Sequence, residues 1–327
     1  MPPSNVSLRS VSGAGATRRI VVIGDVMADV VARTDVAPRL GTDTDGHVSS
    51  SGGGSGANTA CWLAYLGHPV SFIGTVGADP FGVAARDLLE GSGVDVRLRV
   101  DPTRATGICV VLVGPDRERT MIPDAGANRT LSVADLAEDL FVAGDHLHVS
   151  GYSLLRPGSR AAALVALRRA HEHQMTTSLD AASAGPIADV GAARVLPWLI
   201  DVDLLLANGD EARALSAGLP DGVALDALGA DVVVKLGSGG ASWSRDGASV
   251  AAPALLVPVV DTTGAGDAFA AGFLPTYLEG SGPAAALHEG VRTAALAVSR
   301  TGARPQRPNA QNVSADTVTL TRGAPIR

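Results

Sequence analysis

A short glycine-containing segment, residues 261–267, carries the clearest chemistry in this 327-residue chain. An apolar run over residues 255–260 ends at Asp261, and the sequence DTTGAGD then leads into an Ala- and Phe-rich stretch of helical character. A loop that feeds a helix N-terminus presents unpaired backbone N–H groups and the positive end of the helix dipole, and both bind anions. Asp267 would repel a phosphate bound at this helix start. A carboxylate at this position makes sense if its task is to contact a hydroxyl group close to a phosphoryl group. The pattern therefore indicates phosphoryl transfer to an alcohol.

Two common phosphate-binding motifs do not describe this segment. G-x-G-x-x-G fails because Phe269 stands at its last glycine, and G-x-x-x-x-G-K-[ST] occurs nowhere in the chain. The segment instead resembles the C-terminal signature D-T-x-G-A-G-D of the PfkB (ribokinase-like) family of sugar and nucleoside kinases. Taken alone, it would also suit an ordinary glycine-rich turn.

A second glycine cluster precedes a helix expected over residues 57–66. Glycines let a hydroxylated ligand approach the backbone, and Asn58 offers both hydrogen-bond donors and an acceptor. The stretch resembles the family motif G-G-x-x-x-N, in which the glycine pair, here Gly53 and Gly54, and the asparagine contact sugar hydroxyls. A flexible loop is the alternative for these residues. Ser55 stands where ribokinases proper often carry Lys, which weakens the case for ribose as the substrate.

Asp29 follows the apolar strand expected at residues 20–23 and the turn that begins Gly24-Asp25. The resemblance implies that the Asp29 carboxylate holds two sugar hydroxyls. Met27 stands where many ribokinases have Asn, so one polar contact is missing. A solvated loop carboxylate is the alternative for Asp29.

Asn208 and Glu211 follow an expected strand over residues 204–207 and match the family pattern N-x-x-E. The resemblance implies that they hold Mg²⁺ through its water shell, which suits an ion that dehydrates reluctantly. The same two residues would also form an ordinary capped helix start.

Lys235 ends an apolar strand that runs into a glycine turn. By resemblance this turn, with Gly237 and Gly240, lies along ATP, and a cation at residue 235 would stabilise charge in the transition state. Many ribokinases have Thr here, and a lysine that extends from the sheet end into water is the alternative.

The resemblance implies a mechanism as well as a set of contacts. Asp267 would act as general base, while the loop residues Gly264, Ala265 and Gly266 form the anion hole for the transferring phosphoryl group, with Gly266 also at the nucleotide. ATP and Mg²⁺ would be the cofactors. Asp261 and Thr263 resemble positions that ligate a monovalent cation, K⁺, in several members.

Two other functions stay open. A nucleoside kinase of the same fold would favour aromatic side chains that stack on a base, and this chain has only three Trp, three Tyr and five Phe. A non-catalytic sugar-binding regulator would keep Asp29 and Asn58 but lose the base or the anion-hole glycines.

The elements that position these motifs alternate between apolar strands and Ala/Leu/Arg helices, which predicts a mainly parallel sheet covered on both faces. Most motifs fall at strand carboxyl ends, where such sheets bind ligands. The resemblance implies a ribokinase-like three-layer α/β/α domain over residues 19–303, with a small β-sheet lid from residues 30–51 and 98–121 that covers the sugar and in some members forms a dimer interface. Asp79 before Pro80 predicts a helix N-cap. The expected strands cover residues 20–23, 71–73, 108–113, 146–149, 177–179, 204–207, 232–236 and 255–260, and the expected helices 57–66, 160–173 and 211–217.

Composition bounds the remaining possibilities. Apolar residues make up 46% and aromatic residues 3%, so the core must be built from small aliphatic side chains. A net charge of −7 without a Lys/Arg cluster gives little support to nucleic acid or an anionic membrane as partners. Two cysteines without C-x-x-C spacing suit a reducing compartment, and we expect a cytoplasmic protein with a disordered leader (1–18) and a loose tail (304–327).

Overall fold

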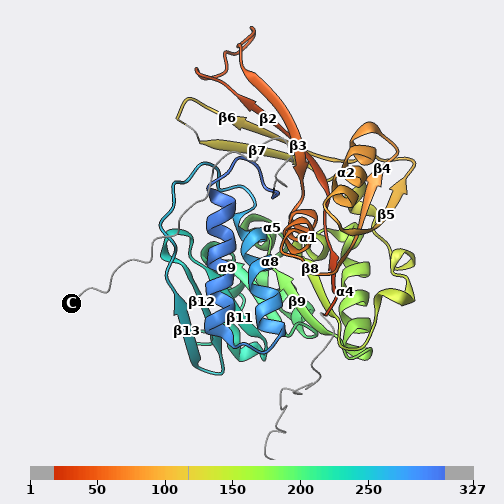
Figure 1. Ribbon diagram of the computed structural model, residues 1–327, viewed down its shortest axis with the longest axis vertical. Coiled ribbons are helices and arrows are strands. Elements are labelled where there is room, and N and C mark those ends of the chain that lie inside the picture. The colour runs from red at the N-terminus through yellow and green to blue at the C-terminus, as the bar shows by residue number, and fades with distance from the viewer. Residues whose placement is uncertain (1–17, 117, 306–327) are drawn as a thin grey trace, which may run out of the picture.

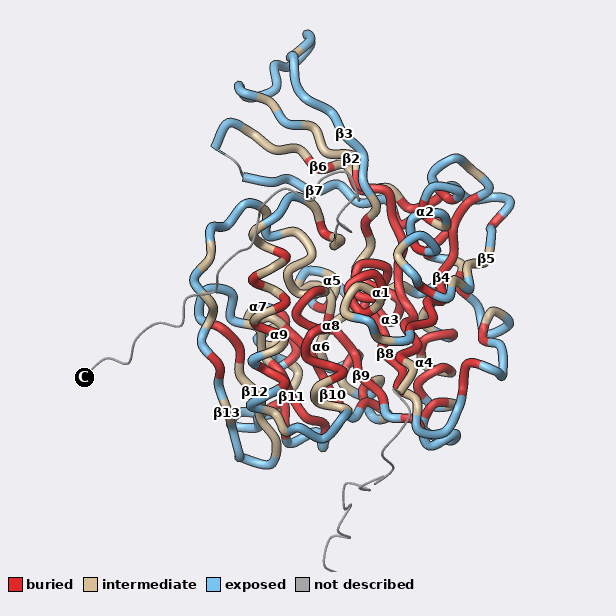
Figure 2. The backbone as a smooth tube through the Cα atoms, viewed as in Figure 1, coloured by how far each residue is buried: buried red, intermediate tan, exposed pale blue. Residues whose placement is uncertain are grey.

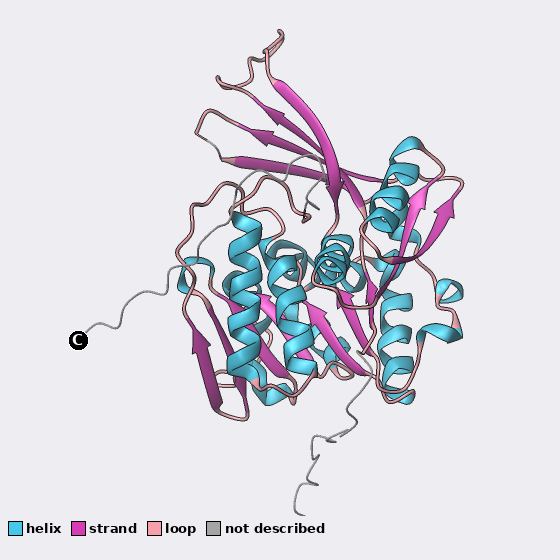
Figure 3. Cartoon of the chain, viewed as in Figure 1, coloured by secondary structure: helices cyan, strands magenta, loops and turns pink. Residues whose placement is uncertain are grey.

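The computed structural model describes residues 18–116 and 118–305 (Figure 1). The leader and the tail expected at residues 1–18 and 304–327 therefore lie outside the described residues, except at their inner ends. The described chain forms a large sheet covered by helices and a smaller sheet that stands over one end of it (Figure 3).

The large sheet is parallel from β5 to β11 and has an antiparallel edge formed by β12 and β13. Its strand order is β13-β12-β11-β10-β9-β8-β1-β4-β5. The strands are β1 (Ile20–Ile23), β4 (Val70–Gly77), β5 (Asp95–Asp101), β8 (His146–Ser150), β9 (Thr176–Asp180), β10 (Leu204–Asn208), β11 (Asp231–Lys235), β12 (Ala241–Arg245) and β13 (Ala248–Ala252).

Helices cover both faces of this sheet, which confirms the three-layer arrangement. Strand β1 shows why: Ile20 and Val22 belong to one buried apolar cluster, and Val21 and Ile23 to the other. Figure 2 shows the buried backbone concentrated in these strands and the helices against them. Helices α1 (Ser55–Tyr65), α2 (Pro80–Gly91), α8 (Ala265–Leu278) and α9 (Pro283–Val298) pack on the first cluster, and α3 (Gly151–Leu155), α4 (Pro157–Glu172), α5 (Ala184–Val190), α6 (Ala192–Val195) and α7 (Gly209–Ser216) on the second.

The helices behave locally as the sequence predicted. Asp79 caps α2, where its Oδ1 accepts from the N–H of Gly82 at 2.9 Å, and Pro80 is the first helical residue.

Across the described part of the chain, no helix combines the length and the apolar character needed to cross a bilayer.

The smaller sheet, called the lid here, has the order β3-β2-β6-β7. It is mixed, because β2 pairs antiparallel with β3 but parallel with β6, which in turn pairs antiparallel with β7. The lid was expected at residues 30–51 and 98–121; residues 98–101 instead belong to β5 of the large sheet, where they pair with β4. The lid strands are β2 (Met27–Arg33), β3 (His47–Gly53), β6 (Gly107–Val113) and β7 (Arg119–Asp124).

The prediction of a strand at residues 255–260 is wrong, because this segment is irregular and Leu256 is fully exposed. Pro253 and Pro258 lack the N–H that a ladder needs, so the antiparallel edge ends with β13. The N–H of Val260 donates instead to the carbonyl of Val298 at the end of α9, at 2.7 Å.

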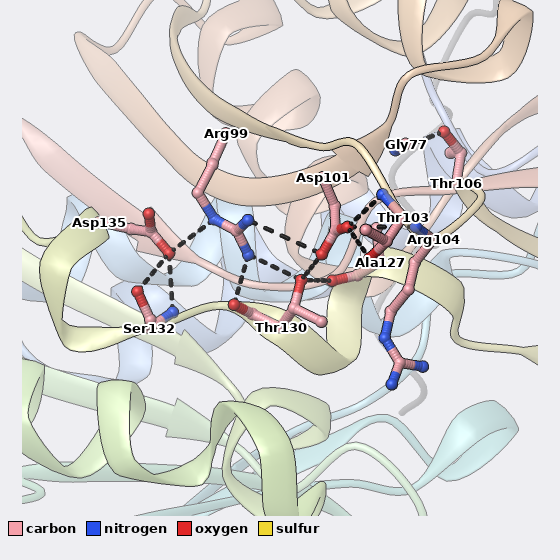
Figure 4. Close-up of polar contacts among 10 residues, drawn as sticks. All are labelled: Gly77, Arg99, Asp101, Thr103, Arg104, Thr106, Ala127, Thr130, Ser132 and Asp135. Carbon is pink, nitrogen blue, oxygen red and sulfur yellow. Dashed lines mark hydrogen bonds and ion pairs between the residues drawn. The ribbon is translucent and has the colours of Figure 1, made fainter.

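A polar network holds the chain where it leaves the large sheet for the lid (Figure 4). Asp101 ends β5, and its Oδ1 accepts from the N–H and hydroxyl of Thr103, both at 2.8 Å, while its Oδ2 accepts from Thr130 Oγ1 at 2.7 Å. These hydrogen bonds, led by that from the Thr103 N–H, hold the pKa of Asp101 well below its usual range. Arg99 reaches the same network and pairs with Asp135 at 3.0 Å. The end of β5 is therefore fixed to the segments that lead into and out of the lid.

A close backbone approach joins the first strand to the first helix. A Cβ atom on Gly24 would lie 2.5 Å from Gly56 Cα, so both residues must be small. We expect Gly24→Ala to lower the free energy of unfolding by about 1–3 kcal/mol, as overpacking does in other cores. Urea denaturation measures this change.

Gly91→Ala is the matched control for that variant. A Cβ there meets nothing within 4 Å, and the residue lies in α2, so we expect alanine to be neutral or stabilising. Equal stability of Gly24→Ala and the wild type would show that the approach is not a constraint.

Candidate active site

The DTTGAGD segment forms the loop and first turn of α8. Gly264 precedes the helix with a φ of +74°, and a Cβ there would lie 2.6 Å from the carbonyl oxygen of Ala303. Glycine is therefore required both by conformation and by space. Ala265 N–H donates to the carbonyl of Thr262 at 3.3 Å. The N–H groups of Gly266 and Asp267 follow in the first turn, where a helix supplies no carbonyl partner.

The two glycine motifs of the sequence meet at Asp267. Ser55 Oγ donates to Asp267 Oδ1 at 2.8 Å, and Asn58 Nδ2 donates to Asp267 Oδ2 at 2.9 Å. Both donors lie in the first turns of α1, so the N-terminal ends of α1 and α8 face one another across the carboxylate. Asn58 was a sequence candidate, whereas Ser55 was noted only for the lysine that it replaces.

The Asp267 carboxyl is tuned to titrate near neutrality. Burial raises its pKa to about 7; the Asp180 charge acts in the same direction, and the hydrogen bonds from Asn58 and Ser55 and the Lys235 charge oppose the increase. A carboxyl with this pKa can accept a proton at physiological pH and is still in part ionised.

Asp29 approaches the same site from lid strand β2. A Cβ on Gly53 would lie 2.3 Å from both carboxylate oxygens of Asp29, so glycine at 53 makes room for this side chain. Burial raises the pKa of Asp29 to about 6, with the Arg304 charge opposing it and those of Asp25 and Asp261 adding to it. The structure thus brings together three expected sugar contacts, which are Asp29, Gly53 and Asn58. Gly54, the fourth, caps α1 with a φ of +93°.

Arg304 is a site residue that the sequence did not reveal, because it was assigned to the tail. Its Nε donates to Asn58 Oδ1 at 3.0 Å and its Nη2 to the carbonyl of Gly53 at 2.7 Å. With Oδ1 accepting from a donor-only guanidinium, the Asn58 amide must direct its NH₂ toward Asp267. Arg304 Nη1 is buried and has no hydrogen-bond partner among the described residues. No motif marks this arginine, so only the fold could find it.

Lys235 lies behind the DTTGAGD loop and does not extend into water. Its Nζ is 2.5 Å from Asp180 Oδ2, and the side chain is 14% exposed. A Cβ on Gly266 would lie 3.2 Å from Nζ, which places the ammonium beside the first turn of α8. Burial alone would lower the pKa of Lys235, but the charges of Asp180 and Glu211 raise it, so the ammonium stays protonated. Asp180 could have been found as a carboxylate at a strand carboxyl end.

Asn208 and Glu211 form a capping box at the start of α7. Asn208 Oδ1 accepts from the N–H groups of Asp210 and Glu211 at 2.9 Å, and Glu211 Oε2 accepts from the N–H of Asn208 at 2.7 Å. The helix-start alternative therefore describes their contacts, and their metal role stays a prediction. No group of three or more His, Cys, Asp or Glu that could hold a metal occurs in the described ranges.

The glycine turn after β11 has one residue that the fold requires. Gly240 has a φ of +89°, and a Cβ there would lie 2.0 Å from the carbonyl oxygen of Ala252. Gly237 has a φ of +58° and is exposed, with open space where a side chain would be. An exposed, glycine-rich turn at the end of β11 suits the approach of a large ligand.

Asp261 and Thr263 lie beneath the edge of the lid. Asp261 Oδ1 accepts from the N–H and hydroxyl of Thr263, at 2.9 and 2.6 Å, and Oδ2 accepts from the N–H of Gly302 at 3.0 Å. Arg119 of β7 donates from Nη1 to the same Oδ1 at 2.9 Å and also contacts the hydroxyls of Thr262 and Thr263. The lid therefore contacts the DTTGAGD loop directly.

The chain is similar to known kinases along most of its length. The chain is 36% identical over 303 residues to the ATP-dependent ribose-1-phosphate kinase of Halopiger xanaduensis. This alignment covers 91% of this chain and 97% of that protein. The crystal structure of adenosine kinase from Sinorhizobium meliloti superposes with a TM-score of 0.78 at 26% identity, over 89% of this chain and 96% of that one. A double mutant of fructokinase from Vibrio cholerae O395, with fructose, ADP and potassium bound, gives 0.74 at 26% identity, over 88% and 94%.

The model of the pfkB family carbohydrate kinases matches residues 17–310, which include every site residue described above. The chain therefore belongs to the pfkB family of carbohydrate kinases.

Proposed function

We propose that Asp267 is the general base of an ATP-dependent phosphoryl transfer to a sugar hydroxyl, and that the GAGD loop is the anion hole. One observation carries this proposal: the Asp267 carboxylate, with a pKa raised to about 7, lies in the first turn of α8 and accepts hydrogen bonds from Ser55 and Asn58. A base with that pKa stands beside the N–H groups that favour an anion.

The reaction follows from this placement. Asp267 accepts the proton of the substrate hydroxyl while that oxygen forms a bond to the γ-phosphorus of ATP. The bond from this phosphorus to the oxygen bridging the β- and γ-phosphates breaks, and ADP leaves with the electron pair. The N–H groups of Gly266 and Asp267 stabilise charge on the transferring group, and the Lys235 ammonium lies behind them. Phosphoryl transfer needs little covalent help, so positioning and fixed charges supply most of the acceleration.

The residues at the nucleotide end suit ATP and a hydrated divalent cation. Asn208 and Glu211 offer oxygen atoms at the carboxyl end of β10, and the exposed Gly237 leaves the neighbouring turn open to a ligand. Mg²⁺ prefers oxygen ligands and keeps several of its waters, so these residues would hold it indirectly. When bound, Mg²⁺ neutralises negative charge on the phosphates.

We further propose that the substrate is a sugar that carries a negative charge. Arg304 lies beside Asn58 and Gly53 in the sugar site and brings a permanent positive charge to it. A phosphorylated sugar would pair with that charge, and the Halopiger relative is named for such a substrate. A nucleoside remains the alternative, since the fold is shared with an adenosine kinase. A homodimer through the lid and a cytoplasmic location stay proposals.

The role of Asp267 is tested by an asparagine substitution. We expect Asp267→Asn to lower kcat by about 10²–10⁴-fold, the usual value of a general base, with the KM for ATP nearly unchanged. ADP release is measured with Mg²⁺ and ATP on ribose, ribose 1-phosphate, fructose, 2-keto-3-deoxygluconate and adenosine. A loss of less than about tenfold would remove Asp267 from this role. A sugar that raises the melting temperature without any turnover in the wild type would indicate a binding protein.

The raised pKa values of Asp267 and Asp29 predict that the rate depends on pH. Protonation of Asp267 removes the base, so kcat/KM should fall as the pH drops through about 7. Asp29, with a pKa raised to about 6, should add a second loss at lower pH that Asp29→Asn abolishes. A rate profile that stays flat between about pH 6 and 8 would contradict the assignment of the base.

The contribution of Arg304 to substrate binding is tested by a glutamine substitution. A hydrogen bond to a charged group contributes about 1.5–3 kcal/mol, so Arg304→Gln should raise the KM for ribose 1-phosphate by about 10- to 100-fold. The KM for ribose should change less, and Arg300→Gln, an exposed neighbour, should change neither. Equal effects on both sugars would show that Arg304 acts only through Asn58.

A further inference from the structure

The two residues implied as ligands of a monovalent cation already have partners. Asp261 Oδ1 accepts three hydrogen bonds, from the N–H and hydroxyl of Thr263 and from Arg119 Nη1. Its Oδ2 accepts from Gly302 N–H, and the Thr263 hydroxyl also contacts Arg119. These side-chain oxygens are therefore engaged with donors, which does not fit a site where they would coordinate K⁺.

The partner that takes this place is itself a cation. The guanidinium of Arg119 is charged at every pH that a folded protein meets, and its planar fork matches a carboxylate with neighbouring hydroxyls. It reaches three consecutive residues of the loop, Asp261, Thr262 and Thr263. Its side chain is 33% exposed and that of Asp261 15%, so the pair is partly shielded from water.

A positive charge is needed at this point for an electrostatic reason. Asp261 stands three residues before the anion hole, and its charge reaches far enough to raise the pKa of Asp29 in the sugar site. An uncompensated carboxylate here would oppose both the phosphates of ATP and the charge that develops in the transition state. A neighbouring cation removes that opposition.

We propose that Arg119 of the lid supplies, at this loop, the positive charge that would otherwise come from a bound monovalent cation, so this kinase works without K⁺. The inference rests on the proposed phosphoryl transfer. It also gives the lid a second role, because β7 brings the compensating charge to the anion-hole loop when the lid covers the sugar. The related fructokinase with bound potassium shows that K⁺ accompanies ADP in another protein of this fold.

The test compares KCl with choline chloride at equal ionic strength. The wild-type rate should change by less than about twofold between the two salts, whereas Arg119→Gln should lose about tenfold in choline chloride and regain most of it in KCl, since a fixed charge beside an anion hole is worth at least that much. The melting temperature is the second readout: KCl should raise it for Arg119→Gln relative to choline chloride, but not for the wild type.

Arg33→Gln is the matched control. Arg33 is exposed and lies in the same row of the lid as Arg119, because Val113 pairs with both. Removing its charge should create no response to K⁺. If the wild type phosphorylates no sugar, the proposed function fails, while the melting temperatures still report cation binding.

Three results would overturn the inference. The first is strong activation of the wild type by K⁺. The second is an Arg119→Gln variant that keeps full activity in choline chloride. The third is a loss of activity that K⁺ leaves unchanged, with no K⁺-dependent melting temperature, since Arg119 would then be only a contact between lid and loop.

Discussion

The structure depends on holding one carboxylate in a place that disfavours its charge. Asp267 lies where two helix N-termini meet, and burial raises its pKa to about 7 although Ser55 and Asn58 both donate to it. A carboxylate in water would be a weak base with a pKa near 4. The fold partly shields this group from water, and two hydrogen bonds keep it in one orientation. Those two opposing effects set the proton affinity that the proposed chemistry needs.

Much of the surrounding architecture serves that balance. Gly24 and Gly56 let β1 and α1 touch, which brings Ser55 and Asn58 to the end of the sheet. Gly264 lets α8 begin against Ala303, and the chain then continues to Arg304, which fixes the amide of Asn58. Fixed positive charges complete the site from different directions, Lys235 from the sheet and Arg119 from the lid. Because each of these cations pairs with a carboxylate, the site contains local electric fields while its net charge stays small.

The contacts in the structure decide between some of the alternatives that the sequence left open, but not between all of them. Lys235 is buried against Asp180, which excludes the alternative in which it extends into water. Asn208 and Glu211 make the capping box that an ordinary helix start would make, and these contacts neither add to nor remove a metal role. The apolar run at residues 255–260 resembled a strand because periodicity cannot register the missing N–H groups of Pro253 and Pro258. Residues 98–101 were assigned to the lid because sequence pattern does not reveal which sheet a strand joins.

The sequence by itself determined the family and the alternation of strands and helices, and it marked Asp29, Gly53, Asn58 and Asp267 as candidate site residues, because glycines with required conformations and a carboxylate in a fixed motif leave a local pattern. Only the tertiary structure decided which groups meet. Ser55, Arg304, Asp180 and the Arg119–Asp261 pair contact partners between 55 and 251 residues away in the chain. Such contacts depend on how the sheet order and the lid bring distant segments together, and no local spacing encodes them. The same limit applies to the pKa of Asp267, since burial is a property of the assembled fold.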